Sequence, residues 1–190
     1  TSLILQGSKE IGKDNMIVMG IDGSTSSSGW AIFESEECKR IDSGRLQPKG
    51  TDWRNRIEQE WILFSQIFEK YHPQKIYIED VPMKDGKPTI LKLGSVQGMA
   101  ICLAAQYGAE IKFLLPSEWR SGLNLYDGTR EGTHRDVLKR KAVETANKLF
   151  NLNLKWVKEK SKKNEDDEAE ALLIAYSQIK KRKFGKPKSQ

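Results

Sequence analysis

The sequence predicts an α/β protein with a five-stranded mixed sheet and helices on both faces. Short apolar runs bounded by turn residues, which are typical of strands, alternate with longer stretches whose apolar residues recur at helical spacing. Their order is three strands, helix, strand, helix, strand and then helices, which predicts one mixed sheet. The 190 residues contain no obvious linker and no internal repeat, so we expect one domain.

The chain is organised around its first two predicted strands. An apolar run at residues 17–21 ends on Asp22, Gly, Ser and Thr residues follow, and a second apolar run begins at Trp30. This pattern predicts a β-hairpin with Asp22 at the carboxyl end of a buried strand, the edge where open α/β sheets bind ligands. Because Asp also caps turns, this stretch alone leaves both roles open for Asp22.

A third strand and a helix come next. Residues 38–46 alternate weakly and predict a strand, and residues 51–71 have the clearest helical pattern in the chain. We expect His72 and Pro73 to end this helix, with His72 as a helix-end residue rather than a ligand. The apolar positions of the helix are Ile57, Trp61, Phe64 and Phe68.

A fourth strand and a helix rich in small residues follow. Residues 75–80 predict a strand that ends on two acids, Glu79 and Asp80, and a basic loop then runs to residue 93. Residues 94–107 predict a helix whose small side chains would let the sheet or a second subunit approach closely. These small residues are Gly98, Ala100, Cys102, Ala104 and Ala105.

The remaining elements are one strand and three helices. Residues 110–115 predict the fifth strand, after which Ser117 is expected to cap a short helical turn. Residues 124–133 are polar and predict a loop, and residues 135–150 and 166–181 predict two longer helices.

The formal net charge is +6, and basic residues cluster toward the C-terminal end of the chain. Such clusters favour a polyanionic partner, most often nucleic acid. A solvated surface and a disordered basic tail at residues 182–190 would have the same composition. One cluster contains Lys155, Lys158, Lys160, Lys162 and Lys163, and the other contains Lys180, Lys181, Arg182, Lys183, Lys186 and Lys188.

The composition also predicts where the protein works. No apolar run approaches the ~18 residues that span a bilayer, and the N-terminal segment lacks the pattern of a signal peptide. We expect Cys38 and Cys102 to be small core residues in a reducing compartment. The sequence therefore predicts a soluble cytoplasmic protein without a membrane partner. Its single domain would cover residues 16–181, after an N-terminal extension or expression remnant at residues 1–15.

Three predicted elements bring acidic residues to one edge of the sheet. Asp22 ends the first strand and Glu79 the fourth, so their carboxylates would meet if these strands are adjacent and parallel. On the last helix, Asp167 and Glu170 share a face, and so do Asp166 and Glu170. Helical spacing therefore does not choose between the two aspartates. The helix dipole favours acids in the first turn, but it explains Glu170 less well because that residue lies a full turn inside.

Four carboxylates in one place repel one another unless cations neutralise them. Oxygen ligands without cysteine or histidine suit Mg²⁺ or Mn²⁺ rather than zinc. Two such ions can activate water and stabilise the leaving oxygen of a phosphodiester. Together with the basic surroundings, the acidic residues predict hydrolysis of a nucleic-acid phosphodiester.

Four motifs occur in order along the chain: G-I-D-G-S-T-S-S-S-G-W-A, I-Y-I-E-D, L-G-S-V-Q-G-M-A-I-C-L-A-A and D-E-A-E-A-L-L-I-A. They resemble the motifs of the RuvC-type Holliday junction resolvases, in the form found in phage and prophage members of this ribonuclease H-like family. The resemblance covers residues 16–179. Each motif is weak alone, but four in this order are specific.

The resemblance implies a ribonuclease H-like fold and a metal-dependent endonuclease that cuts four-way DNA junctions by paired symmetric nicks. It implies that Asp22, Glu79, Asp167 and Glu170 are the catalytic ligands of two Mg²⁺ or Mn²⁺ ions. It also implies a homodimer formed through the helix at residues 94–107. An isologous dimer would match the two-fold symmetry of a junction.

This sequence departs from the family pattern in three places. Gly23-Ser24 replaces the usual Pro-Gly after the first aspartate, a change that is common in the phage branch. Glu170 replaces the usual aspartate. The aromatic residue that often follows the second acid is missing from V-P-M-K-D-G-K-P, so Met83 or a lysine must supply any wedge that opens the junction.

Basic and hydroxyl side chains in the loops and helices near the acidic edge are the candidates for contacting DNA. They are Ser24, Lys84, Lys87, Arg120, Arg135, Lys139, Lys162 and Lys163.

Three other functions remain open from the sequence. A nuclease of the same fold could act mainly on flaps, forks or other branched DNA. A catalytically silent nucleic-acid-binding module would leave the acidic residues unexplained. An actin-like phosphate loop that binds ATP would need a second domain, for which 190 residues leave no room.

Overall fold

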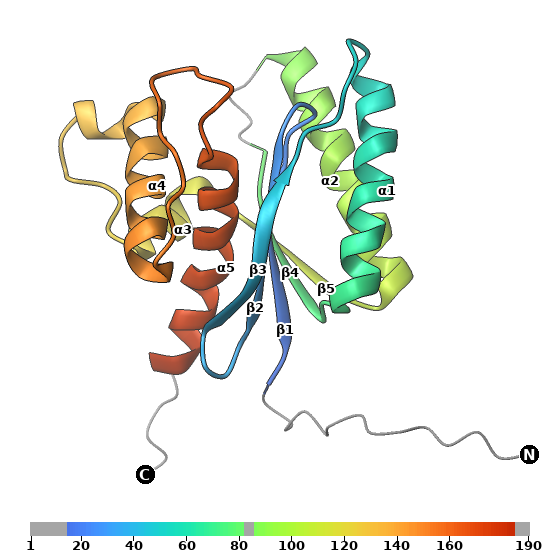
Figure 1. The fold of residues 1–190 in the computed structure, drawn as a ribbon, viewed down its shortest axis with the longest axis horizontal. Coiled ribbons are helices and arrows are strands. Elements are labelled where there is room, and N and C mark those ends of the chain that lie inside the picture. Colours follow the sequence, from blue (N-terminus) through green and yellow to red (C-terminus); the bar gives the residue numbers. More distant parts are fainter. Residues whose placement is uncertain (1–14, 82–85, 185–190) are drawn as a thin grey trace, which may run out of the picture.

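The structure is a computed structural model that describes residues 15–81 and 86–184 (Figure 1). The predictions for Met83 and Lys84, for nearly all of the N-terminal segment and for the last six residues lie outside the described residues. The side chains of residues 181–184 are also not described.

Five strands form one sheet in the order β3-β2-β1-β4-β5. Strand β1 pairs antiparallel with β2 and parallel with β4, while β2–β3 is antiparallel and β4–β5 is parallel. The predicted mixed sheet is confirmed, and β1 and β4 are adjacent and parallel as the acidic site requires. The strands are β1 Ile17–Asp22, β2 Ser28–Glu34, β3 Lys39–Leu46, β4 Lys75–Glu79 and β5 Glu110–Leu114.

Helices cover both faces of the sheet, which confirms the predicted layers (Figure 1). On one face, α1 and α2 pack over a core that includes Ile32, Phe64 and Leu103. On the other face, α3, α4 and α5 pack over a core that includes Phe33 and Leu172. The helices are α1 Trp53–Tyr71, α2 Lys87–Tyr107, α3 Pro116–Gly122, α4 Arg135–Phe150 and α5 Asp166–Phe184, with a 3₁₀ turn at Glu131–Thr133.

The ends of α1 are set by local chemistry. The Asp52 side chain accepts a hydrogen bond from the Arg54 amide at the start of the helix. His72 adopts a left-handed conformation (φ 47°), and its amide donates to the Phe68 carbonyl. The prediction that His72 is a helix-end residue is confirmed.

Helix α2 differs from the prediction in its start. It begins at Lys87 rather than at residue 94, so the second half of the predicted basic loop is helical. The basic, glycine-containing stretch suggested a loop, but Pro88 is well tolerated in the first turn of a helix, where its missing N–H has no partner to lose. Helix α3 likewise begins at Pro116, so Ser117 lies inside it rather than capping it.

One prediction about α2 was wrong. Cys102 is exposed rather than part of the core. Among the described helices, α2 alone is long and apolar enough to cross a membrane by length and composition, although the sequence suggested no such segment. A core helix passes the same test, and α2 buries Val96, Ala100 and Leu103 against the sheet.

Candidate active site

The carboxyl ends of β1 and β4 place Asp22 and Glu79 side by side. The parallel register pairs Ile21 with Ile78, so the next residue on each strand is one of these acids. The acid on β1 is followed by a short serine-rich turn (residues 23–27), and the acid on β4 by Asp80 and Val81. The structure thus brings together the two strand-end acids that the sequence predicted to meet.

Two glycines let α5 lie against the backbone of the sheet at this edge. A Cβ atom on Gly29 would lie 1.8 Å from the carbonyl oxygen of Asp167, and one on Gly20 would lie 2.2 Å from that of Ala171. Only glycine allows so close an approach of helix and strand. The contact fixes the first turns of α5 over β1 and β2, where Asp167 and Glu170 are located.

The carboxylates of Asp22, Glu79, Asp167 and Glu170 act on one another, and we call them the acidic cluster. Burial raises the pKa of Asp22 well above its ordinary value, and the charges of Glu170, Glu79 and Asp167 raise it further. The pKa values of Glu79 and Asp167 are also raised, first by burial and in part by Glu170. The cluster therefore carries strong mutual repulsion.

Two basic side chains lie among these carboxylates. Arg120 Nη2 is 2.8 Å from Glu170 Oε1 and 3.5 Å from Glu79 Oε2. Lys139 Nζ is 3.7 Å from Asp167 Oδ1 and 3.8 Å from Glu170 Oε2. The carboxylates raise the pKa of Lys139 above its ordinary value. Both cations offset part of the repulsion within the acidic cluster.

Trp119 is a part of the site that sequence reasoning missed. Its indole Nε1 donates a hydrogen bond of 2.8 Å to Glu79 Oε2, and its ring is fully buried. The local sequence pattern carries little sign of this contact, and only the order of the strands places the segment near the site. Strand β5 is parallel to β4, so the segment that follows it, with Trp119 and Arg120, starts at the same edge of the sheet.

The neighbouring acids face other partners. Asp166 pairs with Lys139, and the Ser43 hydroxyl donates to Glu168 at 2.7 Å. Asp80 Oδ1 accepts hydrogen bonds from the Val81 amide and from the Gln97 side chain. Asp80 therefore turns toward α2, away from the acidic cluster.

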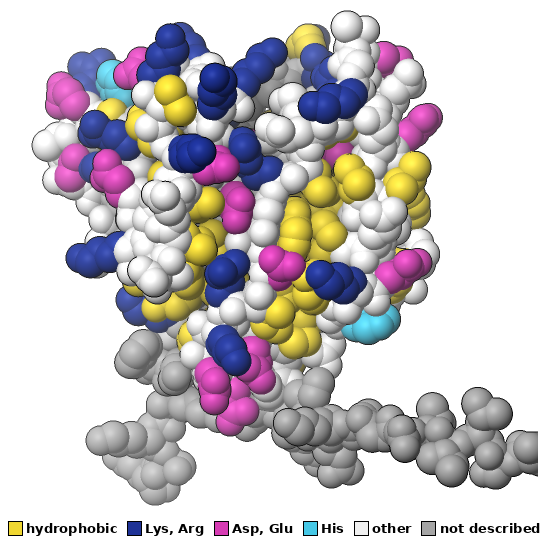
Figure 2. Space-filling view, in the orientation of Figure 1, with side chains coloured by type: hydrophobic (Ala, Val, Ile, Leu, Met, Phe, Trp, Pro, Cys, Tyr) yellow, Lys and Arg dark blue, Asp and Glu magenta, His cyan; other side chains and the backbone are white. Residues whose placement is uncertain are grey.

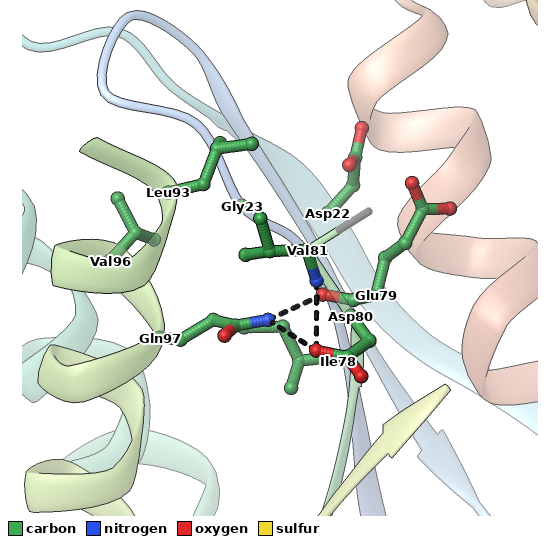
Figure 3. Close-up of a pocket in the computed structure, with 9 residues that line it drawn as sticks. All are labelled: Asp22, Gly23, Ile78, Glu79, Asp80, Val81, Leu93, Val96 and Gln97. Carbon is green, nitrogen blue, oxygen red and sulfur yellow. Dashed lines mark hydrogen bonds between the residues drawn. The ribbon is translucent and has the colours of Figure 1, made fainter. Parts of the chain in front are cut away.

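A small pocket of about 40 Å³ adjoins the acidic cluster (Figure 3). It lies between the ends of β1 and β4 and the first half of α2, at Leu93, Val96 and Gln97. In Figure 3 the carboxylates of Asp22 and Glu79 point toward α5, while Gln97 reaches toward Asp80 from the opposite side. The pocket is lined by Asp22, Gly23, Ile78, Glu79, Asp80, Val81, Leu93, Val96 and Gln97.

The chemistry of the acidic cluster fits a hard divalent cation. Its donors are carboxylate oxygens without thiolate or imidazole, and a divalent cation would relieve the repulsion that raises their pKa values. Among the described residues, no three Asp, Glu, His or Cys side chains converge closely enough to hold an ion in the present arrangement. Arg120 and Lys139 contact the carboxylates instead.

The other candidates for DNA contact lie at varied depths. Arg120 and Lys139 face the acidic cluster, as described above. Ser24 is half-buried in the turn after Asp22. Arg135 is exposed but close enough to lower the pKa of Glu79. In Figure 2, Lys and Arg side chains gather over the upper part of the molecule, where Figure 1 places the β1–β2 turn and the start of α5. Further exposed candidates are Lys87, Lys162 and Lys163.

Known proteins that are similar to this chain include crossover junction endodeoxyribonucleases RuvC. A crossover junction endodeoxyribonuclease RuvC of Nitratidesulfovibrio vulgaris (strain Hildenborough) is 27% identical over 111 residues, which are 57% of this chain and 67% of the relative. The protein of the same description from Rickettsia bellii (strain OSU 85-389) is 26% identical over 165 residues, 85% of this chain and 96% of the relative.

Solved structures share the fold. The T. thermophilus RuvC in complex with Holliday junction substrate matches with a TM-score of 0.68 at 14% identity, over 90% of this chain and 97% of that one. The yeast mitochondrial Holliday junction resolvase Ydc2 matches with a TM-score of 0.54 at 18% identity, over 85% and 77% of the two chains. The family model for crossover junction endodeoxyribonuclease RuvC matches residues 18–131. This chain belongs to the RuvC family.

Proposed function

We propose that this protein is a divalent-metal-dependent endonuclease that resolves four-way DNA junctions by paired, symmetric nicks. The observation that carries the proposal is that carboxylates from β1, β4 and α5 lie at one edge of the sheet, close enough to raise one another's pKa values. The family supports it, because its members are described as crossover junction endodeoxyribonucleases. The Thermus relative, described in complex with a Holliday junction, supports branched DNA as the substrate.

We assign Asp22, Glu79, Asp167 and Glu170 as the ligands of two Mg²⁺ or Mn²⁺ ions. When bound, such ions activate water and stabilise the leaving oxygen of a phosphodiester. The chain itself supplies the geometry: the two strand ends fix Asp22 and Glu79, and α5 fixes the other two carboxylates. Trp119 orients Glu79 through its hydrogen bond to Oε2.

We assign Arg120 and Lys139 to the scissile phosphate. Both side chains reach the acidic cluster, and both are largely enclosed, at 15% and 17% exposure. The guanidinium of Arg120 reaches the acidic cluster through Nη2, and a guanidinium in this position can also donate to a phosphate oxygen. Cations in this position would stabilise negative charge that develops on the phosphate.

A basic surface around this centre would hold the DNA backbone. Ser24, Lys87 and Arg135 flank the edge at which β1 and β4 end, and Lys162 and Lys163 precede α5. Contacts between lysine or arginine and phosphate release counterions, so junction affinity should fall steeply with salt. These residues would position the junction rather than read its sequence.

We further propose that the protein is a homodimer, located in the cytoplasm, whose interface includes α2. Gly98, Cys102 and Ala105 lie at i, i+4 and i+7 on one side of α2 and are partly or fully exposed. Beside them, a largely apolar groove of about 530 Å³ runs between α1 and α2, where Trp61 and Met99 contribute to the lining. A self-complementary contact through this face would place two active sites in two-fold symmetry.

A panel of DNA substrates tests the proposal. Purified protein is incubated with a four-way junction, a flap, a fork and a linear duplex, in Mg²⁺, in Mn²⁺ and in EDTA. We expect two symmetric nicks in the junction, in either metal and not in EDTA, and little cleavage of linear duplex. Faster cleavage of the flap or fork would favour the branched-DNA nuclease, and no cleavage of any substrate would overturn the proposal.

A further inference from the structure

Glu60 is a buried acid on the side of β2 opposite to α5. Its side chain on α1 is fully buried, and its Oε2 atom has no hydrogen-bond partner among the described residues. Burial raises the pKa of Glu60 to about 8, against opposing contributions from the Ser28 hydroxyl and the charge of Arg56. A buried carboxylate with an unsatisfied oxygen is costly, so the neutral acid is favoured.

The hydrogen bonds around Ser28 independently indicate a neutral Glu60. Ser28 Oγ lies 2.8 Å from Glu60 Oε1 and 2.7 Å from the Ser24 carbonyl oxygen, and the Ser24 amide donates to it at 2.9 Å. A hydroxyl carries one proton and cannot donate to both oxygens. If Glu60 is protonated and donates to Oγ, the Ser28 proton is free for the Ser24 carbonyl, and every contact has a donor.

This arrangement links α1 to the serine turn (residues 23–27) that follows Asp22. Glu60 contacts Ser28 at one end of the turn, and Ser28 bonds both the amide and the carbonyl of Ser24. Arg56, one helical turn before Glu60, donates its Nε to the Thr25 carbonyl and its Nη1 to the Gly50 carbonyl at 2.9 Å. Two side chains of α1 therefore hold the turn.

We propose that Glu60 is a positioning residue that, as a neutral acid, donates a hydrogen bond to Ser28 and thereby fixes the serine turn beside Asp22. The inference rests on the proposed function, because the turn joins an assigned metal ligand to Ser24, a candidate phosphate contact. The charged side chain that acts on Glu60 is Arg56, and its guanidinium is occupied by backbone carbonyls.

Ionisation of Glu60 would loosen the turn. A carboxylate would draw the Ser28 proton away from the Ser24 carbonyl, leaving that oxygen without its donor. Cleavage by the wild-type protein should therefore decline at alkaline pH through a group on α1 that touches neither metal nor DNA. Misplacement of a catalytic group by about 1 Å can cost on the order of a hundredfold in rate.

The first test asks whether Glu60 is neutral in the folded protein, and it does not depend on catalysis. Glu60→Gln keeps a donor for Ser28 but cannot ionise. A folded-state pKa of about 8 lies above the ordinary value of 4.5, so wild type loses stability relative to Glu60→Gln as the pH rises between these values. We expect the difference in Tm, variant minus wild type, to grow by at least about 5 °C from pH 5 to pH 8.5. A difference that is constant with pH would overturn a neutral Glu60.

The second test measures positioning. We expect wild type to lose junction cleavage above pH 8 relative to Glu60→Gln, and Glu60→Leu to be slower by on the order of tenfold to a hundredfold at all pH values. Hydrogen exchange of the Ser24 amide should be faster in Glu60→Leu and unchanged in Glu60→Gln at pH 6. Equal exchange in all three proteins would overturn the proposal that Glu60 fixes the serine turn. If no protein cleaves junctions, the proposed function fails, while the Tm and exchange results still decide the role of Glu60.

Discussion

The residues of the acidic cluster differ in how the chain holds them. Glu79 accepts a hydrogen bond from Trp119, and Glu170 pairs with Arg120. Asp22 is different, because burial and three neighbouring carboxylates raise its pKa, and among the largest contributions the charge of Lys139 alone opposes them. The site is therefore electrostatically strained around Asp22, and binding of divalent cations should relieve that strain.

Substitutions on α5 test which acids of this helix are ligands. We expect Asp167→Asn and Glu170→Gln each to lower junction cleavage by at least about a hundredfold, because each removes charge that the reaction needs. Asp166→Asn should cost less, since Asp166 pairs with Lys139, and Glu168→Gln should be close to wild type, since it contacts Ser43. Single-turnover cleavage rates provide the comparison, and a largest loss for Asp166→Asn would contradict the assignment.

Sequence reasoning identified the acids at the strand ends, but it did not identify the residues that orient them or hold the neighbouring turn. Asp22 and Glu79 were predictable because a strand end fixes where a residue lies. Helical spacing could not separate Asp166 from Asp167, because both share a face with Glu170. Trp119 and Glu60 act through contacts between elements distant in sequence, at 40 and 32 residues' separation from their partners, so local pattern carries little sign of them.

The contact of α5 with the sheet is the element-scale feature that assembles the site. Gly20 on β1 and Gly29 on β2 remove the side chains that would hold the helix away. Ala171 and Ala175 of α5 face Gly20, and the backbone of Asp167 and Glu168 faces Gly29. A strand interior that contains glycine is a known sign of close backbone approach, so this contact was partly visible in the sequence.

A glycine substitution tests this contact. We expect Gly29→Ala to lower both Tm and cleavage strongly, because its Cβ would lie 1.8 Å from the Asp167 carbonyl oxygen and displace the first turn of α5. Gly94→Ala on α2 is the matched control, because no atom lies within 4 Å of its added Cβ. The control should be neutral or stabilising by up to about 1 kcal/mol. Equal thermal stability and equal cleavage for the two variants would contradict the close contact between α5 and β2 at Gly29.

Element boundaries were the least predictable part of the fold. The pattern of strands and of α4 follows from apolar spacing, which burial enforces directly. The start of α2 does not, because Pro88 and Gly94 weaken the helical pattern where the helix has little contact with the core. Helix α2 buries only one side, and Cys102 lies on the exposed side although its sequence neighbours are apolar.

At the scale of the whole molecule, paired nicks require two active sites, which a homodimer would supply. We expect the protein to sediment as a homodimer and Ala105→Glu to give monomers with weak junction binding, because a charge on the exposed face of α2 opposes a close apolar contact. Gln106→Glu adds the same charge at the neighbouring exposed position and serves as the control. A wild-type protein that is monomeric both free and on a junction, by analytical ultracentrifugation, would contradict the dimer.

The fold and the family also bear on the rival functions. The Gly-Ser-rich hairpin that suggested an ATP phosphate loop is the β1–β2 turn of a RuvC-family sheet, with Asp22 at its start. A silent DNA-binding module would have no need for four neighbouring carboxylates that repel one another. Both alternatives are thereby weaker than a metal-dependent nuclease.

Asp22→Asn tests the central claim most directly, through junction cleavage and junction affinity measured on the same preparation. Asparagine keeps the shape of the side chain and removes the charge with the strongest mutual repulsion, so the variant should fold with an equal or higher Tm without divalent metal. We expect cleavage in Mg²⁺ to fall by at least about a hundredfold, while affinity for the four-way junction stays equal or rises, because one negative charge near the phosphates is gone. Cleavage at the wild-type rate would contradict a metal centre built on Asp22.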